Sequence, residues 1–434
     1  MIDVLICGAG ATGLTLAIEL QRRGIEYRLI DPATEPFGGS RGKGIQPRSL
    51  EIFDMMGVID DVLEDSSLYQ PLKLYIGPVT KMAASLGTDH APTEDKPYPN
   101  VRMVPQWRTE QALRGRLAEL GGVIERGVAL ESLEQSDGQV TATLSNGETV
   151  TARYLIGCDG GRSVTRGEIG LSLVGETLDD KTMIVADFEL EGLDRSVWHV
   201  WPAKKGGPIA FAPLPFPNTW QLQGHERIAK NGLEEGIAKL LKKRPSKIIW
   251  QSRFKHQRRM VEKYRVGNVF LAGDAAHLHP PSGAQGLNTG VQDAFNLGWK
   301  LAAALTSGDE SILDTYEAER LPIAADMLNL TSTLHLEGST KRGDLTNQLS
   351  IGYRGGPLAE GTAAGELQPG DRMPDMILAD GTRLLETMRH GGATRVACKD
   401  GETVLVRPDG YIAAIGADDR ETYYGLPIRD VQAA

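Results

Sequence analysis

The sequence predicts an α/β protein in which a mainly antiparallel β-sheet is inserted into a parallel nucleotide-binding sheet. Three observations lead to this fold class. The apolar run Ile2–Cys7 leads directly into a glycine-rich turn and a helical pattern. Residues from about 175 to 265 alternate as strands instead, and a second strand–turn–helix pattern starts at Val269. At roughly 150 residues per domain, a chain of 434 residues has room for two or three such units.

The first element pair carries a glycine motif. Gly8, Gly10 and Gly13 have the spacing G-x-G-x-x-G, with Thr12 inside the turn. In such a motif the first glycine permits a tight turn, the second lets the backbone approach a pyrophosphate, and the third lets helix and strand pack closely. The helix amides and dipole then face an anion. The alternative is a glycine turn that serves packing alone.

An acidic residue completes this pattern. The next strand, residues 27–31, ends at Asp31, 18 residues after Gly13. A carboxylate at this place accepts hydrogen bonds from ribose hydroxyls and repels a 2′-phosphate. The motif therefore predicts a dinucleotide site that suits FAD or NAD better than NADP.

The middle of the chain leaves the nucleotide-binding unit and returns to it. Residues 72–101 are irregular and proline-punctuated, which indicates an excursion, whereas residues 109–120 show a helical pattern. Short strands follow up to residue 156, joined by Asp-Gly and Asn-Gly pairs at 137–138 and 146–147, which are strong hairpin signals. The long helix after the Pro280-Pro281 turn returns the chain to the first unit. We therefore expect FAD- or NAD-binding segments at 1–71, 101–174 and 266–355, substrate-domain segments at 72–100 and 175–265, and a C-terminal segment at 365–434.

Composition excludes several classes of protein. The net charge of −10 opposes general affinity for nucleic acid. The three cysteines, Cys7, Cys158 and Cys398, have no metal-ligand spacing, so we expect reduced thiols, no metal site and a cytoplasmic protein. The apolar run 4–18 is too short to span a bilayer and follows no basic residue, so we expect neither a membrane helix nor a signal peptide.

Three further segments carry a family resemblance. Residues 154–163 (YLIGCDGGRS) and 273–281 (GDAAHLHPP), together with the glycine turn, resemble the FAD-dependent aromatic monooxygenases typified by para-hydroxybenzoate hydroxylase, over about residues 1–350. Residues 40–51 (SRGKGIQPRSLE) are most similar to the phenol and aromatic-polyketide hydroxylase branch. The resemblance implies a Rossmann-like FAD-binding domain with an inserted substrate sheet.

This resemblance implies roles for single residues. By it, Asp274 and Gln106 bind the ribityl chain of FAD, Asp159 serves flavin and nicotinamide binding, and Arg41 lies on a mobile loop beside the flavin and pyrophosphate. The Pro281 backbone carbonyl would lie near the substrate hydroxyl. Each side chain also has a structural alternative, namely a helix cap for Asp274, a turn for Asp159, and a solvated surface position for the other two.

The turn after Pro281 opens the long helix. The amides of Gly286, Leu287 and Asn288 are expected to point at the flavin pyrimidine and to stabilise negative charge on the reduced ring. His277 and His279 flank this turn, and we expect them to pack and hydrogen-bond rather than to act in acid–base catalysis.

Several side chains on the inserted strands are candidates for lining a substrate pocket. Residues two apart share a face of a strand, so one face should line the pocket, but the sequence does not say which. The aromatic content favours a bulky, flat substrate, with ordinary core packing as the alternative. The candidates are Trp198, His199, Trp201, Phe211, Gln221 and Gln223.

Together these features predict an NAD(P)H- and FAD-dependent monooxygenase that hydroxylates a phenolic or multi-ring aromatic molecule, polyketide- or quinone-like, through a flavin 4a-hydroperoxide. FAD would be resident and noncovalent. NADPH or NADH would visit transiently, because the chain has no second dinucleotide fingerprint, and O2 would be the cosubstrate. Epoxidation, Baeyer–Villiger oxygenation and a noncatalytic flavin- or ligand-binding protein remain as alternatives. We expect a monomer or homodimer that binds neither nucleic acid nor membrane.

The C-terminal segment has a resemblance of its own. Residues 370–375 and 404–411 resemble the ends of the thioredoxin-like domain appended in the phenol and polyketide hydroxylase branch. The roughly 65 residues present are marginal for an independent core, so we expect a short thioredoxin-like remnant that leans on the FAD-binding domain. Cys398 has no Cys-x-x-Cys partner, which makes redox activity of this segment unexpected.

Overall fold

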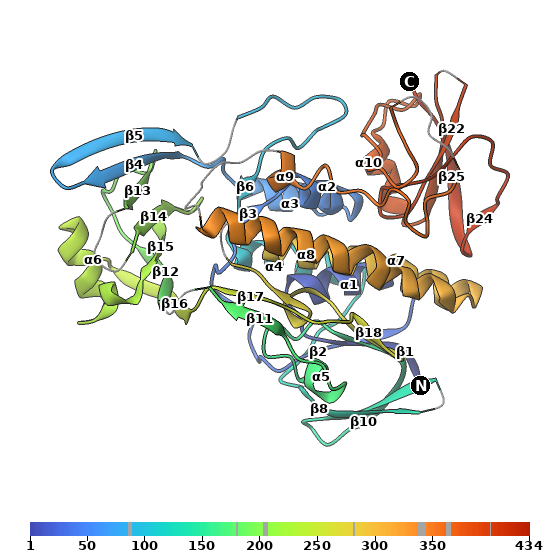
Figure 1. Cartoon of the computed structure of the whole chain (residues 1–434), viewed down its shortest axis with the longest axis horizontal. Coiled ribbons are helices and arrows are strands. Elements are labelled where there is room, and N and C mark those ends of the chain that lie inside the picture. The colour runs from blue at the N-terminus through green and yellow to red at the C-terminus, as the bar shows by residue number, and fades with distance from the viewer. Residues whose placement is uncertain are drawn as a thin grey trace.

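The computed structural model places three bodies side by side. Figure 1 shows the inserted sheet at the left, the nucleotide-binding domain at the centre and below, and the C-terminal unit at the upper right. Asp137 and Pro281, which the sequence analysis singled out, lie outside the described residues. The structure describes residues 1–85, 89–136, 138–178, 181–202, 207–280, 283–336, 344–361, 366–399 and 401–434.

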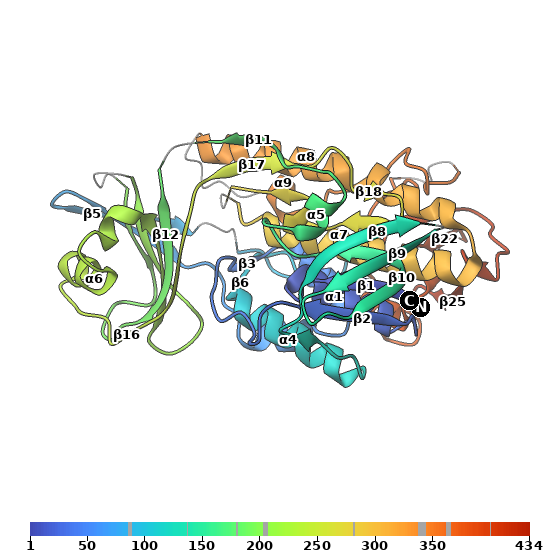
Figure 2. The ribbon, with the colours of Figure 1, turned by 90° about the horizontal axis from the view of Figure 1, so that it is seen from below.

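The nucleotide-binding domain is built on a parallel sheet, as the sequence predicts. Strand β1 pairs in parallel with both β2 and β10, and β10 pairs in parallel with β19. The strand order is β18-β19-β10-β1-β2-β7, and Figure 2 shows this sheet apart from the inserted one. The strand bounds are β1 (Ile2–Cys7), β2 (Tyr27–Asp31), β7 (Glu125–Arg126), β10 (Thr149–Gly157), β18 (Arg265–Val266) and β19 (Val269–Leu271).

A hairpin extends this sheet. Strands β8 (Leu130–Ser136), β9 (Gln139–Leu144) and β10 pair in antiparallel order, which confirms the strands predicted on either side of the two turn signals. Every second residue of β9 is buried, so one face of the hairpin packs on a core and the other faces solvent.

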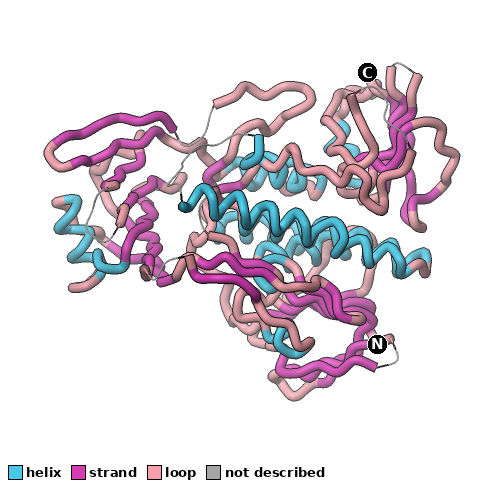
Figure 3. Tube along the Cα trace, in the orientation of Figure 1, coloured by secondary structure: helices cyan, strands magenta, loops and turns pink. Residues whose placement is uncertain are grey.

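Helices cover the sheets and run through the centre of the molecule. The two longest are α7 and α8. Figure 3 shows long helical segments through the middle of the molecule, with strands on both sides of them. None of the described helices combines the length and the hydrophobicity that a membrane span requires. The α-helices are α1 (Ala11–Gln21), α2 (Pro47–Met55), α3 (Ile59–Glu64), α4 (Gln106–Glu119), α5 (Val164–Glu168), α6 (Leu233–Leu241), α7 (Gly286–Ser307), α8 (Asp314–Leu336), α9 (Asp344–Asn347) and α10 (Leu384–Thr387).

The inserted sheet has seven strands and includes a hairpin that the sequence analysis did not predict. Residues 72–101, expected to be irregular, contain strands β4 and β5, and β4 pairs in parallel with β13. Proline at the start of β4 and exposed positions along both strands concealed this pattern. In sheet order the strands are β16 (Lys247–Phe254), β12 (Met183–Glu189), β15 (Thr219–His225), β14 (Ile209–Pro213), β13 (Trp198–Trp201), β4 (Pro71–Ile76) and β5 (Val79–Ser85).

Two small sheets lie in the segments that connect these bodies. Strands β11 (Val174–Thr177), β17 (Gln257–Met260) and β20 (His277–Leu278) form one of them. Strands β3 (Gly44–Ile45) and β6 (Arg102–Met103) form the other.

The C-terminal unit is a five-stranded sheet that packs on the nucleotide-binding domain. Its buried apolar residues belong to the same continuous core as those of α1 and α7. Buried charges add to the contact, because the Arg407 guanidinium donates to both carboxylate oxygens of Glu319 on α8, at 2.6 and 2.9 Å. Its strands are β21 (Ala393–Ala397), β22 (Thr403–Val406), β23 (Ile412–Ile415), β24 (Thr422–Tyr423) and β25 (Leu426–Gln432).

Candidate functional site

Two of the three motif glycines are required by packing inside the protein. A Cβ on Gly8, whose φ is +105°, would lie 2.4 Å from the backbone oxygen of Cys158. A Cβ on Gly13 would lie 1.9 Å from the backbone oxygen of Gly8. These glycines therefore let β1, α1 and the end of β10 approach one another closely.

Gly10 is different, because nothing in the described protein crowds it. The nearest atom to a Cβ at this position would be Glu110 Oε1, at 3.9 Å. Gly10 is also the N-cap of α1 and supplies no side-chain cap, so the amides of the first helical turn have no partner within the helix. The Ala11 amide is hydrogen-bonded to the Glu110 carboxylate. Open space in front of the other first-turn amides, at the positive end of the helix, fits a pyrophosphate, and this explains a glycine that packing does not require.

Thr12 joins the glycine turn to the third motif. A Cβ on Gly273 would lie 2.5 Å from Thr12 Oγ1, and one on Gly290 would lie 2.7 Å from the same oxygen. Gly273 starts the short 3-10 helix η2 (Gly273–Ala275), and Gly290 lies in the first turns of α7. Two segments that follow Thr12 by 261 and 278 residues in sequence therefore meet at this threonine.

Asp31 supports the turn from the neighbouring strand. Its carboxylate accepts hydrogen bonds from the backbone amides of Ala9, at 2.7 Å, and Ala33, at 2.8 Å. A carboxylate has about four acceptor positions, so acceptors remain for the ribose hydroxyls that the sequence analysis assigned to it.

Asp159 and Asp274 both keep acceptor capacity near this junction. Asp159 Oδ2 accepts from the amide and the hydroxyl of Thr165, each at 3.0 Å, while its Oδ1 is buried without a hydrogen-bond partner in the part of the chain that the structure describes. Such an orphaned acceptor is costly and fits a ligand donor. The Asp274 side chain is exposed, yet desolvation by the surrounding protein raises the pKa of its carboxyl, against the effects of His277 and Arg41.

Gln106 holds the segment that carries Arg41. The Gln106 side-chain oxygen accepts a hydrogen bond from the backbone amide of Gly42 at 3.2 Å, and the backbone amide of Gln106 donates to the Gly42 carbonyl at 2.9 Å. Its Nε2 donates to Glu110, at 2.9 Å. Residues 39–44, here called the Arg41 loop, thus rest on the first turn of α4, and the Arg41 side chain is exposed beside Ser252.

The other side of the Arg41 loop is bound to the inserted sheet by Gln221, which the sequence analysis named as a pocket candidate, and by Asp187, which it missed. Ser40 Oγ donates to Asp187 at 2.6 Å, and Lys43 Nζ donates to Gln221 Oε1. Gln221 donates in turn to Ser40 Oγ at 2.9 Å, and lies opposite Asp187 on the neighbouring strand. Ser40, Lys43, Asp187 and Gln221 form what we call the loop–sheet cluster. An aspartate in the middle of the apolar stretch MIVADFE was the one available signal.

The structure divides the substrate-lining candidates between the two faces of the inserted sheet. Gln221 lies on the face toward the Arg41 loop, Gln223 shares that face by strand alternation, and the Trp198 ring lies 4.7 Å from Lys43 Nζ. Phe211 and Trp201 lie on the other face, in the core beneath α6.

His199 also belongs to that other face. It is paired with the Tyr75 hydroxyl at 2.7 Å and with the Asp194 carbonyl at 2.8 Å. His199, Trp201 and Phe211 are therefore occupied by packing, which the sequence could not show because alternation does not reveal which face turns inward.

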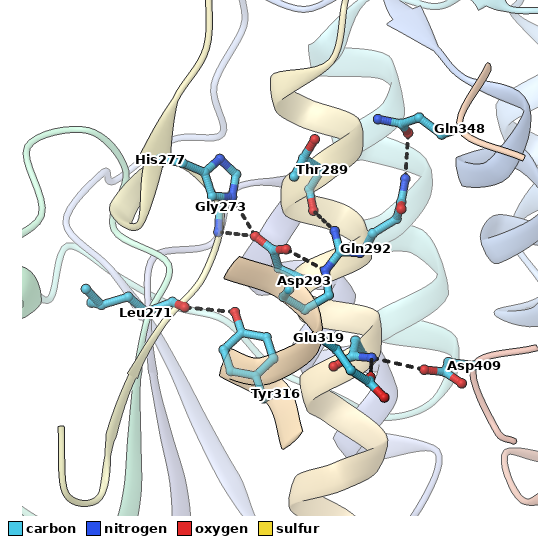
Figure 4. Close-up of polar contacts among 12 residues, drawn as sticks. Leu271, Gly273, His277, Thr289, Gln292, Asp293, Tyr316, Glu319, Gln348 and Asp409 are labelled. Atoms are coloured by element: carbon cyan, nitrogen blue, oxygen red, sulfur yellow. Dashed lines mark hydrogen bonds and ion pairs between the residues drawn. The ribbon is translucent and has the colours of Figure 1, made fainter. Parts of the chain in front are cut away.

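His277 is part of a fully buried charge network (Figure 4). Its Nε2 lies 2.6 Å from Asp293, which also accepts from Arg320 at 2.9 Å and from the Gly273 amide at 3.2 Å. The attraction of His277 and Arg320 keeps the pKa of Asp293 low despite burial. His279 donates to or accepts from His277 at 3.0 Å, so the network fixes the turn that holds Asp274.

At the start of α7, backbone amides are available for a ligand, while the Asn288 side chain holds the Arg41 loop. Gly286, Leu287 and Asn288 are its first three residues, so their amides have no partner within the helix. The Asn288 side chain accepts from the Gln46 amide and donates to the Gly44 carbonyl, each at 2.8 Å. Asn288 thereby joins α7 to the end of the Arg41 loop, and only its amide is left for a ligand.

Comparison with known proteins decides the family. A model described as the FAD binding domain matches residues 1–331. The chain belongs to this FAD-binding monooxygenase family. A flavin-dependent monooxygenase of Mycobacteroides abscessus is 37% identical over 96% of this chain and 98% of its own. A rifampicin monooxygenase of Streptomyces venezuelae is 33% identical and covers 98% of each chain.

A solved structure agrees with this assignment. The anhydrotetracycline hydroxylase OxyS of Streptomyces rimosus superposes with a TM-score of 0.75 at 28% identity, and the match covers 98% of this chain and 99% of that one. The monooxygenase is thus an FAD-dependent oxidoreductase, as the sequence resemblance implied. The open turn at Gly10 and the orphaned Asp159 oxygen fit its cofactor.

Proposed function

We propose that this monooxygenase hydroxylates a multi-ring phenolic or quinone-like molecule, with NADH or NADPH as reductant and O2 as cosubstrate. Rifampicin and anhydrotetracycline are the compounds named for two of its relatives, and both relatives match nearly the whole chain. FAD, when bound and reduced, supplies the chemistry that activates dioxygen. The protein then has to bind, orient and shield the substrate.

The observation that carries this proposal is the position of the Arg41 loop. On one side the loop rests on Gln106, at the start of α4, and on the other it contacts Gln221 on the inserted sheet. The face of the sheet beside the loop carries the buried Trp198 indole, the buried Gln221 amide that binds the loop, and the half-buried Gln223 two residues on. An aromatic plane with a few fixed polar groups suits a flat molecule that carries hydroxyl or carbonyl groups.

Site residues take the following roles in the proposal. The amides at Gly10 and the first turn of α1 hold the FAD pyrophosphate, Asp31 holds its ribose, and Asp274 holds the ribityl chain. Arg41 provides positive charge beside the flavin. These assignments combine the sequence resemblance with the free acceptors and open amides described above.

A substrate panel tests the proposal. Phenols, naphthoquinones and larger polycyclic phenols are offered separately with NADH and with NADPH, and oxidation of the nicotinamide is followed. At least one polycyclic phenol should accelerate oxidation strongly over the rate without ligand. A panel without any stimulation, on protein that releases FAD when denatured, would favour a noncatalytic flavin- or ligand-binding protein.

A further inference from the structure

We propose that Lys43 and Asp187 are positioning residues that tie the Arg41 loop to the inserted sheet, so that events at the sheet determine where Arg41 lies. The inference rests on the flavin-side role proposed above for Arg41. Neither Lys43 nor Asp187 is a predicted ligand of FAD or substrate. In this proposal the two side chains couple the FAD side of the site to the inserted sheet.

Both ends of the Arg41 loop are closely packed. A Cβ on Gly39 would lie 2.3 Å from the Trp250 ring on β16, and one on Gly44 would lie 2.6 Å from the Tyr69 hydroxyl. The loop therefore touches the inserted sheet where it begins, and Tyr69, two residues before β4, where it ends. Movement of Arg41 has to come from the residues between these two anchors.

Those middle residues are held from two directions. The Gly42 backbone is bound on both its amide and its carbonyl to Gln106, on the FAD side. Ser40 and Lys43 point the opposite way, to Asp187 on β12 and Gln221 on β15. Arg41 is exposed and lies in sequence between Ser40 and Lys43, which are both buried and bound to the sheet. Its place consequently depends on the loop–sheet cluster.

The strength of this attachment depends on the charges of Lys43 and Asp187. Burial lowers the pKa of the Lys43 amine to about 8, and Asp187 is the charged group that opposes this shift. Lys43 also contacts two uncharged groups, the Trp198 ring of β13 and the Gln221 amide of β15. Burial also raises the pKa of Asp187, against its hydrogen bond from Ser40 and the attraction of Lys43. Each charge is thus favoured by the other, and a change at the sheet alters both.

Hydrogen exchange of residues 38–46 in the FAD-loaded enzyme, without substrate, tests the proposal directly. Lys43→Met keeps the apolar stem over Trp198 and removes the charge, and Asp187→Asn keeps a partner for Ser40 and removes the opposite charge. Lys239→Met makes the same chemical change at an exposed position of α6 and serves as the control. Each single substitution leaves the opposite buried charge without its charged partner and should lower stability, whereas the double variant removes both charges. Should Lys43→Met fail to fold, Ser40→Ala removes contacts of the same cluster.

We expect exchange at residues 40–42 to become about tenfold faster in Lys43→Met and in Asp187→Asn, the size expected when a hydrogen bond involving a charged group is lost. The double variant should exchange no faster than either single one, because both remove the same attachment. In the wild-type enzyme, protection at these amides should fall as the pH rises through about 8, whereas Lys43→Met should show no such step.

Two results would overturn the proposal. One is wild-type protection of residues 40–42 in both single variants, and the other is a pH step that persists in Lys43→Met. Since the measurement uses no substrate, it is independent of whether the proposed substrate class is right. In the panel above, the variants should also show a smaller ratio of ligand-stimulated to unstimulated NAD(P)H oxidation than Lys239→Met.

Discussion

Gly10→Ala separates cofactor binding from folding. The backbone of Gly10 has φ −77° and ψ −176°, an extended conformation that alanine adopts without strain. The new methyl group would meet no atom closer than Glu110 Oε1, at 3.9 Å. If the open space belongs to the FAD pyrophosphate, the variant should fold normally and bind FAD poorly.

The magnitudes follow from this geometry. In the FAD-free protein two small effects oppose each other: Gly→Ala reduces the freedom of the unfolded chain, worth about 0.4–1 kcal/mol, and alanine is a poorer N-cap than glycine by about 1 kcal/mol. The free energy of unfolding should therefore change by less than about 1 kcal/mol. For FAD we expect a loss of at least about 2 kcal/mol, or roughly 30-fold in Kd, since a methyl group keeps the pyrophosphate from the helix amides. Gly13→Ala should do the opposite. Its Cβ would lie 1.9 Å from the Gly8 oxygen, so the fold itself should lose about 1–3 kcal/mol or more.

Two assays distinguish these effects. Urea unfolding of FAD-free protein measures the fold, and titration with FAD, followed by quenching of flavin fluorescence, measures the cofactor. Gly115→Ala on α4, where a Cβ meets nothing within 4 Å, is the matched control and should bind FAD like the wild type. Wild-type FAD affinity in Gly10→Ala would refute the assignment of this turn to the pyrophosphate.

Three other substitutions extend the test. Asp274→Ala removes an acceptor for ribityl hydroxyls and should weaken FAD binding by about 1–3 kcal/mol in the same titration; an unchanged Kd would contradict that role. Arg407→Met leaves the buried carboxylates of Glu319 and Asp409 without the guanidinium that each contacts, and should cost about 3–5 kcal/mol in urea unfolding, so a wild-type midpoint would count against it. Cys398→Ser should retain coupled turnover, because a dithiol cycle needs two cysteines and Cys398 stands in no Cys-x-x-Cys motif; loss of turnover with FAD bound would show otherwise.

Local patterns predicted the parallel sheet and the motif residues well, because those patterns are short. The run Ile2–Cys7, the G-x-G-x-x-G turn and the strand ending at Asp31 follow each other directly, so their geometry is fixed by neighbours in sequence. The contact between Thr12 and Gly273 joins residues far apart in sequence. Its residues were both within recognised motifs, but only the fold shows that they touch.

The loop–sheet cluster and the C-terminal ion pairs could not be predicted from the sequence. Ser40 and Asp187 are 147 residues apart, and Arg407 and Glu319 are 88 apart, so no periodicity links them. A charged residue in an apolar strand indicates a buried partner without identifying it. Likewise, alternation along β13 separates Trp198 from His199, but which one faces the Arg41 loop depends on how the whole sheet docks.

Isotope labelling of the product is the most direct test of the central claim. The FAD-loaded enzyme is supplied with NADH or NADPH, the most stimulating phenol of the panel, and dioxygen labelled in both atoms. Mass spectrometry should find one labelled oxygen atom in a ring hydroxyl of the product. A label in a lactone or an epoxide would replace hydroxylation by one of the other oxygenations. A product whose new oxygen comes from water would contradict monooxygenase chemistry altogether.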